Sequence, residues 1–88
     1  APELSVRSLP IRSASQSDPD EQPVAVEATG GATRDILLIN PGGGTIAAED
    51  FELRGQGAVL RYMAGKLQQV LVTGDGEVLI AGQPAAGQ

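Results

Sequence analysis

The sequence contains no cysteine and no histidine among its 88 residues. Disulfides, zinc-finger sites and haem attachment are therefore excluded. Histidine is the most common general base and the cysteine thiolate is a common nucleophile, so two frequent catalytic groups are missing as well. From these absences we predict a chain with no metal site, no cofactor and no catalytic residue of its own.

Aromatic and basic side chains are also scarce. The chain has one tyrosine, one phenylalanine and six Lys and Arg residues against 11 Asp and Glu, which gives a net charge of -5. Nucleic-acid binding needs a basic patch and usually stacking aromatics, and anionic membrane surfaces attract basic segments, so both classes of partner are disfavoured. No apolar run approaches the roughly 20 residues that span a bilayer, and we expect no membrane insertion.

The remaining nucleophiles are poorly placed for catalysis. Lys66 is the only lysine and falls at a predicted turn. Every serine lies at or before position 17, namely Ser5, Ser8, Ser13, Ser15 and Ser17. A Ser–Lys dyad would have neither a rigid scaffold nor an imidazole partner, so we predict that the chain is not an enzyme on its own.

Two groups of carboxylates are the other candidates for chemistry. Asp50 and Glu52 fall on the same face of a predicted strand, about 7 Å apart, a spacing that suits an acid/base pair acting on a sugar. The alternative is a solvated strand face without a catalytic role, and we favour it over the acid/base pair. Asp18, Asp20 and Glu21 form an acidic cluster that lacks the glycine and distal glutamate of an EF-hand loop, so a solvated loop is favoured over a calcium site.

From residue 35 onward, short apolar runs alternate with glycine-rich breaks at intervals of about ten residues, the spacing of an all-β protein. The runs are "DILLIN" (35–40), "TIAAEDFELR" (45–54), "AVLRYM" (58–63), "LQQVLV" (67–72) and "EVLIA" (77–81). Short turns make neighbouring strands antiparallel, so we predict that these five runs form one five-stranded antiparallel sheet. We predict one small domain with an all-β fold, an antiparallel β-sandwich or meander of about 6–7 strands joined by Gly-rich hairpins.

Two runs, "DILLIN" and "QVLV", are apolar on both strand faces. A single sheet with one wet face would alternate throughout, so this pattern predicts burial between two layers and favours a sandwich, with contact to another domain as an alternative.

One stretch leaves the secondary structure open. Residues 58–71 also fit a helix, in which the apolar residues near one face would be Val59, Leu60, Met63, Leu67, Val70 and Leu71. Gly65 would then sit in mid-helix, at about 1 kcal/mol relative to alanine. The hairpin-like "AGK" and the missing N-cap favour two strands.

The first third of the chain is different in composition. "LSVRSLPI" (4–11) alternates weakly and predicts an edge strand, because Pro10 cannot donate to a sheet. "RSASQSDPDEQP" (12–23) is polar and predicts a loop or linker. We divide the chain into residues 1–22 (edge strand and polar loop), 23–82 (antiparallel β-domain, opening with Val24, Val26 and Ala28 on one strand face) and 83–88 (flexible tail).

Three glycine-rich motifs could be either binding loops or structural turns. "TGDG" (73–76) is predicted to be the tip of a hairpin over residues 67–81, with metal ligation by Asp75 as the weaker alternative. "NPGGGT" (40–45) and "ATGGAT" (28–33) lack the spacing of phosphate-binding loops and are predicted to be turns.

Residues 23–82 share their order of predicted strands and turns with a known family. The matching residues are Asp35, Asn40 to Gly43, Ala58 to Arg61 and Leu71 to Gly82, the last in "VLVTGDGEVLIAG". In this order the segment resembles the C-terminal β-sandwich region of heparinase II/III-like polysaccharide lyases. In that family, catalysis uses Tyr, His and Arg or Asn residues of other domains, and none of those positions is matched here.

The resemblance implies a non-catalytic accessory module, or a processed fragment, that packs against a larger partner domain of a carbohydrate-active enzyme. The alternative is an independent secreted structural or protein-interaction module. Either reading predicts a secreted or periplasmic protein. For a carbohydrate contact, Arg61 and Tyr62 are the only aromatic–cation neighbours along the chain, but they point to opposite strand faces and would not form one platform.

Overall fold

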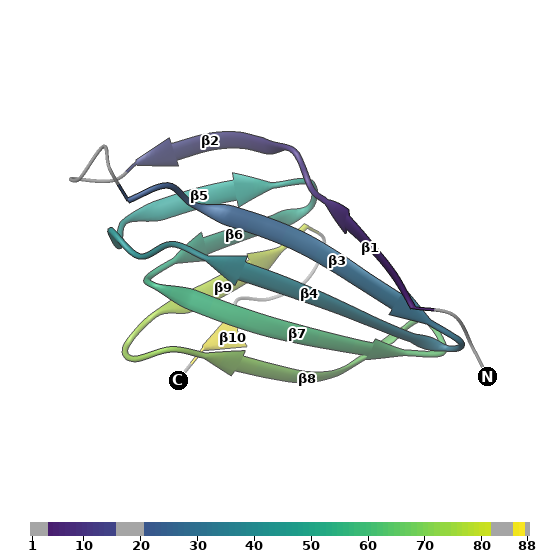
Figure 1. The fold of residues 1–88 in the computed structure, drawn as a ribbon. Coiled ribbons are helices and arrows are strands. Elements are labelled where there is room, and N and C mark those ends of the chain that lie inside the picture. The colour runs from purple at the N-terminus through teal and green to yellow at the C-terminus, as the bar shows by residue number, and fades with distance from the viewer. Residues whose placement is uncertain (1–3, 16–20, 82–85, 88) are drawn as a thin grey trace.

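A computed structural model of the chain describes residues 4–15, 21–81 and 86–87. The described residues contain strands and no helix, and they form two antiparallel five-stranded sheets that face each other (Figure 1). The predicted all-β sandwich is confirmed, with more strands than the 6–7 expected. The strands are β1 (Ser5–Ser8), β2 (Ile11–Ser15), β3 (Val24–Gly30), β4 (Thr33–Ile39), β5 (Thr45–Ala48), β6 (Phe51–Arg54), β7 (Gly57–Met63), β8 (Lys66–Val72), β9 (Glu77–Ile80) and β10 (Ala86–Gly87).

Sheet A has the order β1-β3-β4-β7-β8, and sheet B has the order β10-β9-β6-β5-β2. From β3 onward, hairpins alternate with crossovers. The pairs β3–β4, β5–β6 and β7–β8 are hairpins within one sheet. The connections after β4, β6 and β8 each carry the chain to the other sheet, and all three lie at the same end of the sandwich (Figure 1). We call this the crossover end and the opposite one the hairpin end.

The connection 73–76 is one of these crossovers, so the predicted hairpin over residues 67–81 is wrong. β8 pairs with β7 in sheet A, whereas β9 pairs with β6 in sheet B. The predicted single sheet in the C-terminal half is wrong for the same reason, because its strands are shared between the two sheets. A short glycine-rich loop can step across to the facing sheet as readily as it folds back, and the flanking apolar residues suit both courses.

The N-terminal segment also differs from the prediction. Residues 4–11 do not form one edge strand: β1 lies at the edge of sheet A, and after Pro10 the chain enters sheet B as β2. β2 pairs with β5 as far as Ser15, so residues 12–15 belong to a strand rather than to the predicted loop. In the predicted tail, Ala86–Gly87 pair with β9.

The hairpin β7–β8 confirms two strands in residues 58–71 and makes the helical alternative wrong. Its two turn residues, Ala64 and Gly65, have φ values of 51° and 79°. Two successive positive φ values are typical of a type I′ turn, whose twist matches that of the flanking strands.

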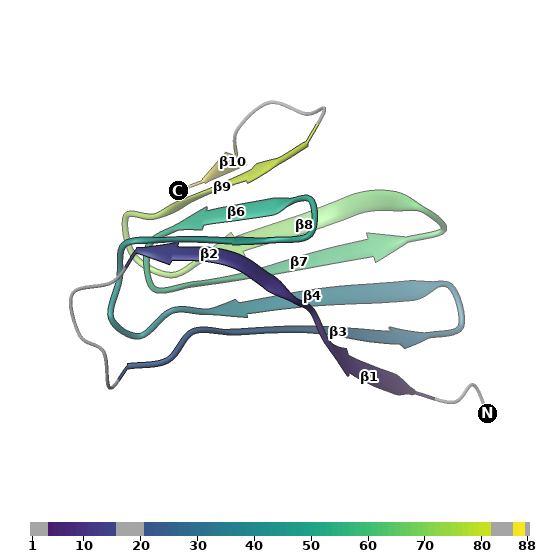
Figure 2. The same cartoon turned by 90° about the horizontal axis from the view of Figure 1, so that it is seen from above.

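The core lies between the two sheets, where inward side chains alternate along each strand. Its largest fully buried apolar side chains come from both sheets: Ile36, Leu38, Ile46, Leu53, Leu60 and Val78. Four of the five strands of sheet A are longer, with seven residues in each of β3, β4, β7 and β8 against four in β5, β6 and β9. Since the sheets meet at the crossover end, sheet A extends beyond the β5–β6 turn at the hairpin end (Figures 1 and 2).

Candidate functional site

Asn40 closes the crossover end of the sandwich. Its side chain is fully buried, and its Nδ2 donates to the carbonyl oxygens of Gly43 (2.7 Å) and Gly55 (3.1 Å). Its backbone N–H donates to the Gln56 carbonyl at 2.8 Å. Within the described residues, only its Oδ1 is a buried side-chain atom without a hydrogen-bond partner. Asn40 therefore joins the loop after β4 to the loop after β6.

Two glycines of this end, Gly55 and Gly76, pack closely against backbone atoms. A Cβ on Gly76 would lie 2.6 Å from the carbonyl oxygen of Arg54, and one on Gly55 would lie 3.0 Å from the Cα of Gly76. In the "NPGGGT" segment, the N–H of Gly43 donates to the Asn40 carbonyl at 2.9 Å. The glycine motifs at 40–45 and 73–76 thus serve as tight crossovers, and "ATGGAT" (28–33) contains the β3–β4 hairpin turn.

The hairpin end carries a cluster of ion pairs instead. Glu27 faces inward from β3 and is 7% exposed. It accepts from Arg7 Nε at 2.7 Å and from Arg34 Nε, and Arg7 also pairs with Glu49 at 3.2 Å. Hydrogen bonds from Arg7 and then Arg34 hold the pKa of the Glu27 carboxyl below its ordinary value. Through Arg7, this cluster joins sheet A to the β5–β6 turn of sheet B.

Arg34 also contacts both aromatic rings of the chain. Its guanidinium carbon lies 5.4 Å from the centroid of Tyr62 and 5.9 Å from that of Phe51, and the two rings meet edge to face at 6.5 Å. Burial raises the pKa of the Tyr62 hydroxyl. Arg61 lies on the opposite strand face from Tyr62, as predicted. Arg34 was missed because it is the cross-strand neighbour of Tyr62, which only the sheet register reveals.

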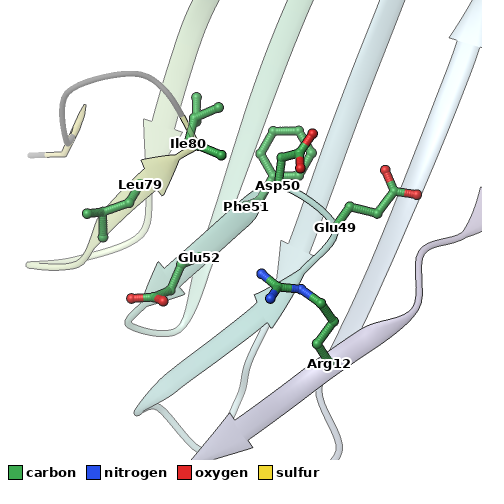
Figure 3. Close-up of a pocket in the computed structure, with 8 residues that line it drawn as sticks. Arg12, Glu49, Asp50, Phe51, Glu52, Leu79 and Ile80 are labelled. Atoms are coloured by element: carbon green, nitrogen blue, oxygen red, sulfur yellow. The ribbon is translucent and has the colours of Figure 1, made fainter.

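A pocket of about 520 Å³ lies beside the β5–β6 turn (Figure 3). Its lining residues are Arg12, Glu49, Asp50, Phe51, Glu52, Leu79, Ile80 and Ala81. The structure thus brings Asp50 and Glu52 together at one pocket, but Asp50 lies in the turn and only Glu52 belongs to β6. Three carboxylates and one guanidinium therefore line the pocket together with apolar side chains. Across the part of the chain that the structure describes, no three metal-ligating side chains lie close enough together to hold a metal ion.

The other predicted candidates are not brought together. Ser5 and Ser8 lie on β1, and Lys66 is the first residue of β8. These two strands form opposite edges of sheet A. Ser13 and Ser15 lie on β2 in the other sheet. Ser17, Asp18 and Asp20 lie outside the described residues, and Glu21 begins the described segment after them.

The outer face of sheet A exposes large apolar side chains. All large hydrophobic residues that are exposed in the described part of the chain lie on strands of sheet A or directly before β1: Leu4, Val6, Val24, Ile39, Met63 and Leu71. Val26, Leu37 and Val59 are half-buried and connect them, forming with Leu71 one cross-strand row. We call the outward side chains of this row, with Val24 and Ile39, the apolar face. Within the described residues, sheet B covers only one side of these strands, so the prediction that "DILLIN" and "QVLV" are buried on both sides is wrong there.

One ion pair accompanies the apolar face. Arg61 on β7 donates to both carboxylate oxygens of Asp35 on β4, at 3.0 and 3.2 Å, and these hydrogen bonds lower the pKa of the Asp35 carboxyl. The two side chains neutralise each other. The outer face of sheet A therefore carries aliphatic groups without a net charge from this pair.

The structure does not contain, in its described segments, a helix long and apolar enough to cross a membrane. In comparisons with known proteins, no family, no curated protein and no solved structure matches the chain.

Proposed function

We propose that the chain is a non-catalytic β-sandwich module whose function is to pack, through the apolar face, against the uncharged surface of a larger partner domain. The single observation that carries this proposal is the distribution of exposed apolar residues. Leu71 is 51% exposed and Val6 63% exposed on sheet A, whereas among the described residues of sheet B no large hydrophobic side chain is exposed. Exposed apolar patches rimmed by polar groups mark interaction surfaces.

The arrangement of polar groups supports a binding role over catalysis. Glu27 is engaged by two arginines and Asp35 by one, so these carboxylates act in ion pairs that support the fold. The partner class that the sequence resemblance implies is the catalytic domain of a secreted or periplasmic polysaccharide lyase, and carbohydrate contact by the module itself is part of that proposal. An independent secreted interaction module is the alternative.

The test begins with the gene on either side of these codons. Any neighbouring domain would be produced as a separate protein and titrated with the 88-residue chain by isothermal titration calorimetry. We expect binding with a negative heat-capacity change, because apolar surface is buried. Leu71→Lys on the apolar face should abolish the heat of binding, whereas Leu79→Lys on the outer face of sheet B should leave it unchanged.

Binding that survives Leu71→Lys would place the contact elsewhere and contradict the proposal. A gene that encodes only a signal peptide and this chain would favour the independent module.

A further inference from the structure

We propose that, in the absence of its partner domain, the chain forms a two-fold dimer in which the apolar faces of two copies pack on each other. This inference rests on the proposed function and concerns the regulation of the same surface: the partner domain must displace the second copy. It follows from the register of sheet A, which makes the apolar face complementary to itself.

The apolar row crosses four adjacent strands in register. Val26 on β3 pairs with Leu37 on β4, Leu37 with Val59 on β7, and Val59 with Leu71 on β8. A two-fold axis that runs along the strands between β4 and β7 exchanges β4 with β7 and β3 with β8. It therefore places Leu37 over Val59 of the second copy and Val26 over Leu71 of the second copy. Sheets that pack face to face keep their strands within about 30° of each other, so this row-on-row contact is retained in a twisted pair.

The same axis pairs the charges correctly. Asp35 and Arg61 are directly opposite each other on β4 and β7, in the row next to the apolar one. The axis therefore brings Asp35 of one copy over Arg61 of the other, and the reverse. Each carboxylate then faces two guanidinium groups, its own and that of the second copy. Isologous interfaces require this kind of self-complementarity.

The polar face of the other sheet does not offer the same match. Glu52 and Arg54 on β6 and Glu77 on β9 are charged residues of sheet B, and Arg54 pairs with Glu77 at 3.1 Å. The chain carries a net charge of -5, so two copies approach each other most readily on the outer face of sheet A, where Asp35 and Arg61 neutralise each other.

The size of the apolar face predicts a weak dimer. Four strands spaced about 4.8 Å apart and seven residues long give a footprint of roughly 450 Å². Stable interfaces bury about 800 Å² per partner, and smaller ones are transient. We therefore expect a monomer–dimer equilibrium with a dissociation constant in the micromolar range, which a partner domain with a larger matching surface can displace.

Sedimentation velocity of the full chain at about 1 to 500 µM tests this directly. We expect the dimer fraction to rise with concentration and Leu71→Lys to raise the dissociation constant by about tenfold or more, since a buried lysine faces apolar groups. The matched control Leu79→Lys should leave the equilibrium unchanged, and circular dichroism would verify that each variant is folded. A chain that stays monomeric throughout, or that grows into larger open assemblies, would overturn the inference.

A charge-swap experiment separates the two-fold contact from an ion pair that serves only the monomer. Asp35→Arg gives a copy with two arginines at this site, and Arg61→Asp gives a copy with two aspartates. Each variant alone should be monomeric because like charges face each other, whereas an equal mixture should recover the dimer. Glu52→Arg and Arg54→Asp change the net charge equally on sheet B and should dimerise like the unaltered chain. A mixture that stays monomeric would overturn the inference.

The two proposals fail separately. If the chain is monomeric but a neighbouring domain binds through Leu71, only the dimer is wrong. If the dimer forms and a neighbouring domain neither binds nor displaces it, the proposed function is wrong and the dimer stands.

Discussion

At the crossover end of the sandwich, three loops pass between the sheets and touch each other through backbone atoms, whereas at the hairpin end ionised side chains bridge the sheets. Gly76 approaches the Arg54 carbonyl so closely that it leaves no room for a Cβ, and Asn40 donates both within its own loop and to the loop after β6. At the hairpin end, Arg7 links Glu27 on sheet A to Glu49 in the β5–β6 turn. One end therefore depends on space and neutral hydrogen bonds, and the other depends on charge. The two should respond differently to mutation and to pH.

The largest effect is expected from Gly76→Ala at the crossover end. The added methyl group would overlap the carbonyl oxygen of Arg54, a backbone atom that cannot move without shifting β6. We expect the free energy of unfolding to fall by about 3 kcal/mol or more, measured by urea denaturation. Gly74→Ala in the same loop is the control, because a Cβ there meets nothing within 4 Å and only the positive φ of 67° is strained. It should be destabilised by about 1–2 kcal/mol. Equal losses for both would show that backbone conformation, and not packing, limits this end.

Asn40→Asp tests the neutral hydrogen bonds of the same end with almost no change in volume. The carboxylate cannot donate to the carbonyls of Gly43 and Gly55, and its charge is fully buried, so we expect a loss of about 2–3 kcal/mol at neutral pH. Burial raises the pKa of such a carboxyl, so part of the loss should be recovered as the pH falls. Gln68→Glu adds the same charge at an exposed position and should change stability by less than about 0.5 kcal/mol. A variant as stable as the unaltered chain would show that Asn40 does not join the loops.

Glu27→Gln tests the charge-dependent end. We expect a smaller loss at neutral pH, about 1 kcal/mol, because the glutamine still accepts a hydrogen bond and the arginines, at 57% and 37% side-chain exposure, remain partly solvated. The pKa of Glu27 is lowered in the folded chain, so its contribution is complete above the ordinary glutamate pKa of about 4.3 and is lost as the pH falls further. Thermal unfolding between pH 3 and pH 7 should therefore show a weaker pH dependence in Glu27→Gln. Some dependence remains, because the pKa of Asp35 is lowered in the same direction. Identical pH profiles for the variant and the unaltered chain would mean that the cluster does not stabilise the fold.

The same contrast explains which features the sequence predicts. Strands such as 57–63 and 66–72 were predicted because their apolar runs end at glycines, and their hairpin follows from local backbone chemistry. The crossover at residues 73–76 was not predicted, because it depends on a contact between Gly76 and Arg54, which are far apart in the sequence. The Arg34–Tyr62 contact likewise depends on the register of β4 and β7. The apolar residues on both faces of "DILLIN" were visible in the sequence, but whether a layer of this chain covers the second face is a property of the whole topology.

The smallest effect, and the only stabilising one, is expected in the β7–β8 turn at the hairpin end. Ala64 has a φ of 51°, a conformation in which its Cβ is strained, and it is followed by Gly65 with a φ of 79°. Ala64→Asn creates the Asn-Gly pair preferred in type I′ turns, and the exposed position leaves room for the amide, so we expect a gain of about 0.5–1 kcal/mol in urea denaturation. Ala32→Asn in the β3–β4 turn is the control, since Ala32 is not among the described residues with positive φ and should gain nothing. If the gain at Ala64 persists at pH 3, while the contribution of Glu27 is lost, turn geometry and ionic contacts stabilise the hairpin end independently. If the gain at Ala64 is instead lost at pH 3, together with the contribution of Glu27, the turn is ordered only while the ionic cluster is intact.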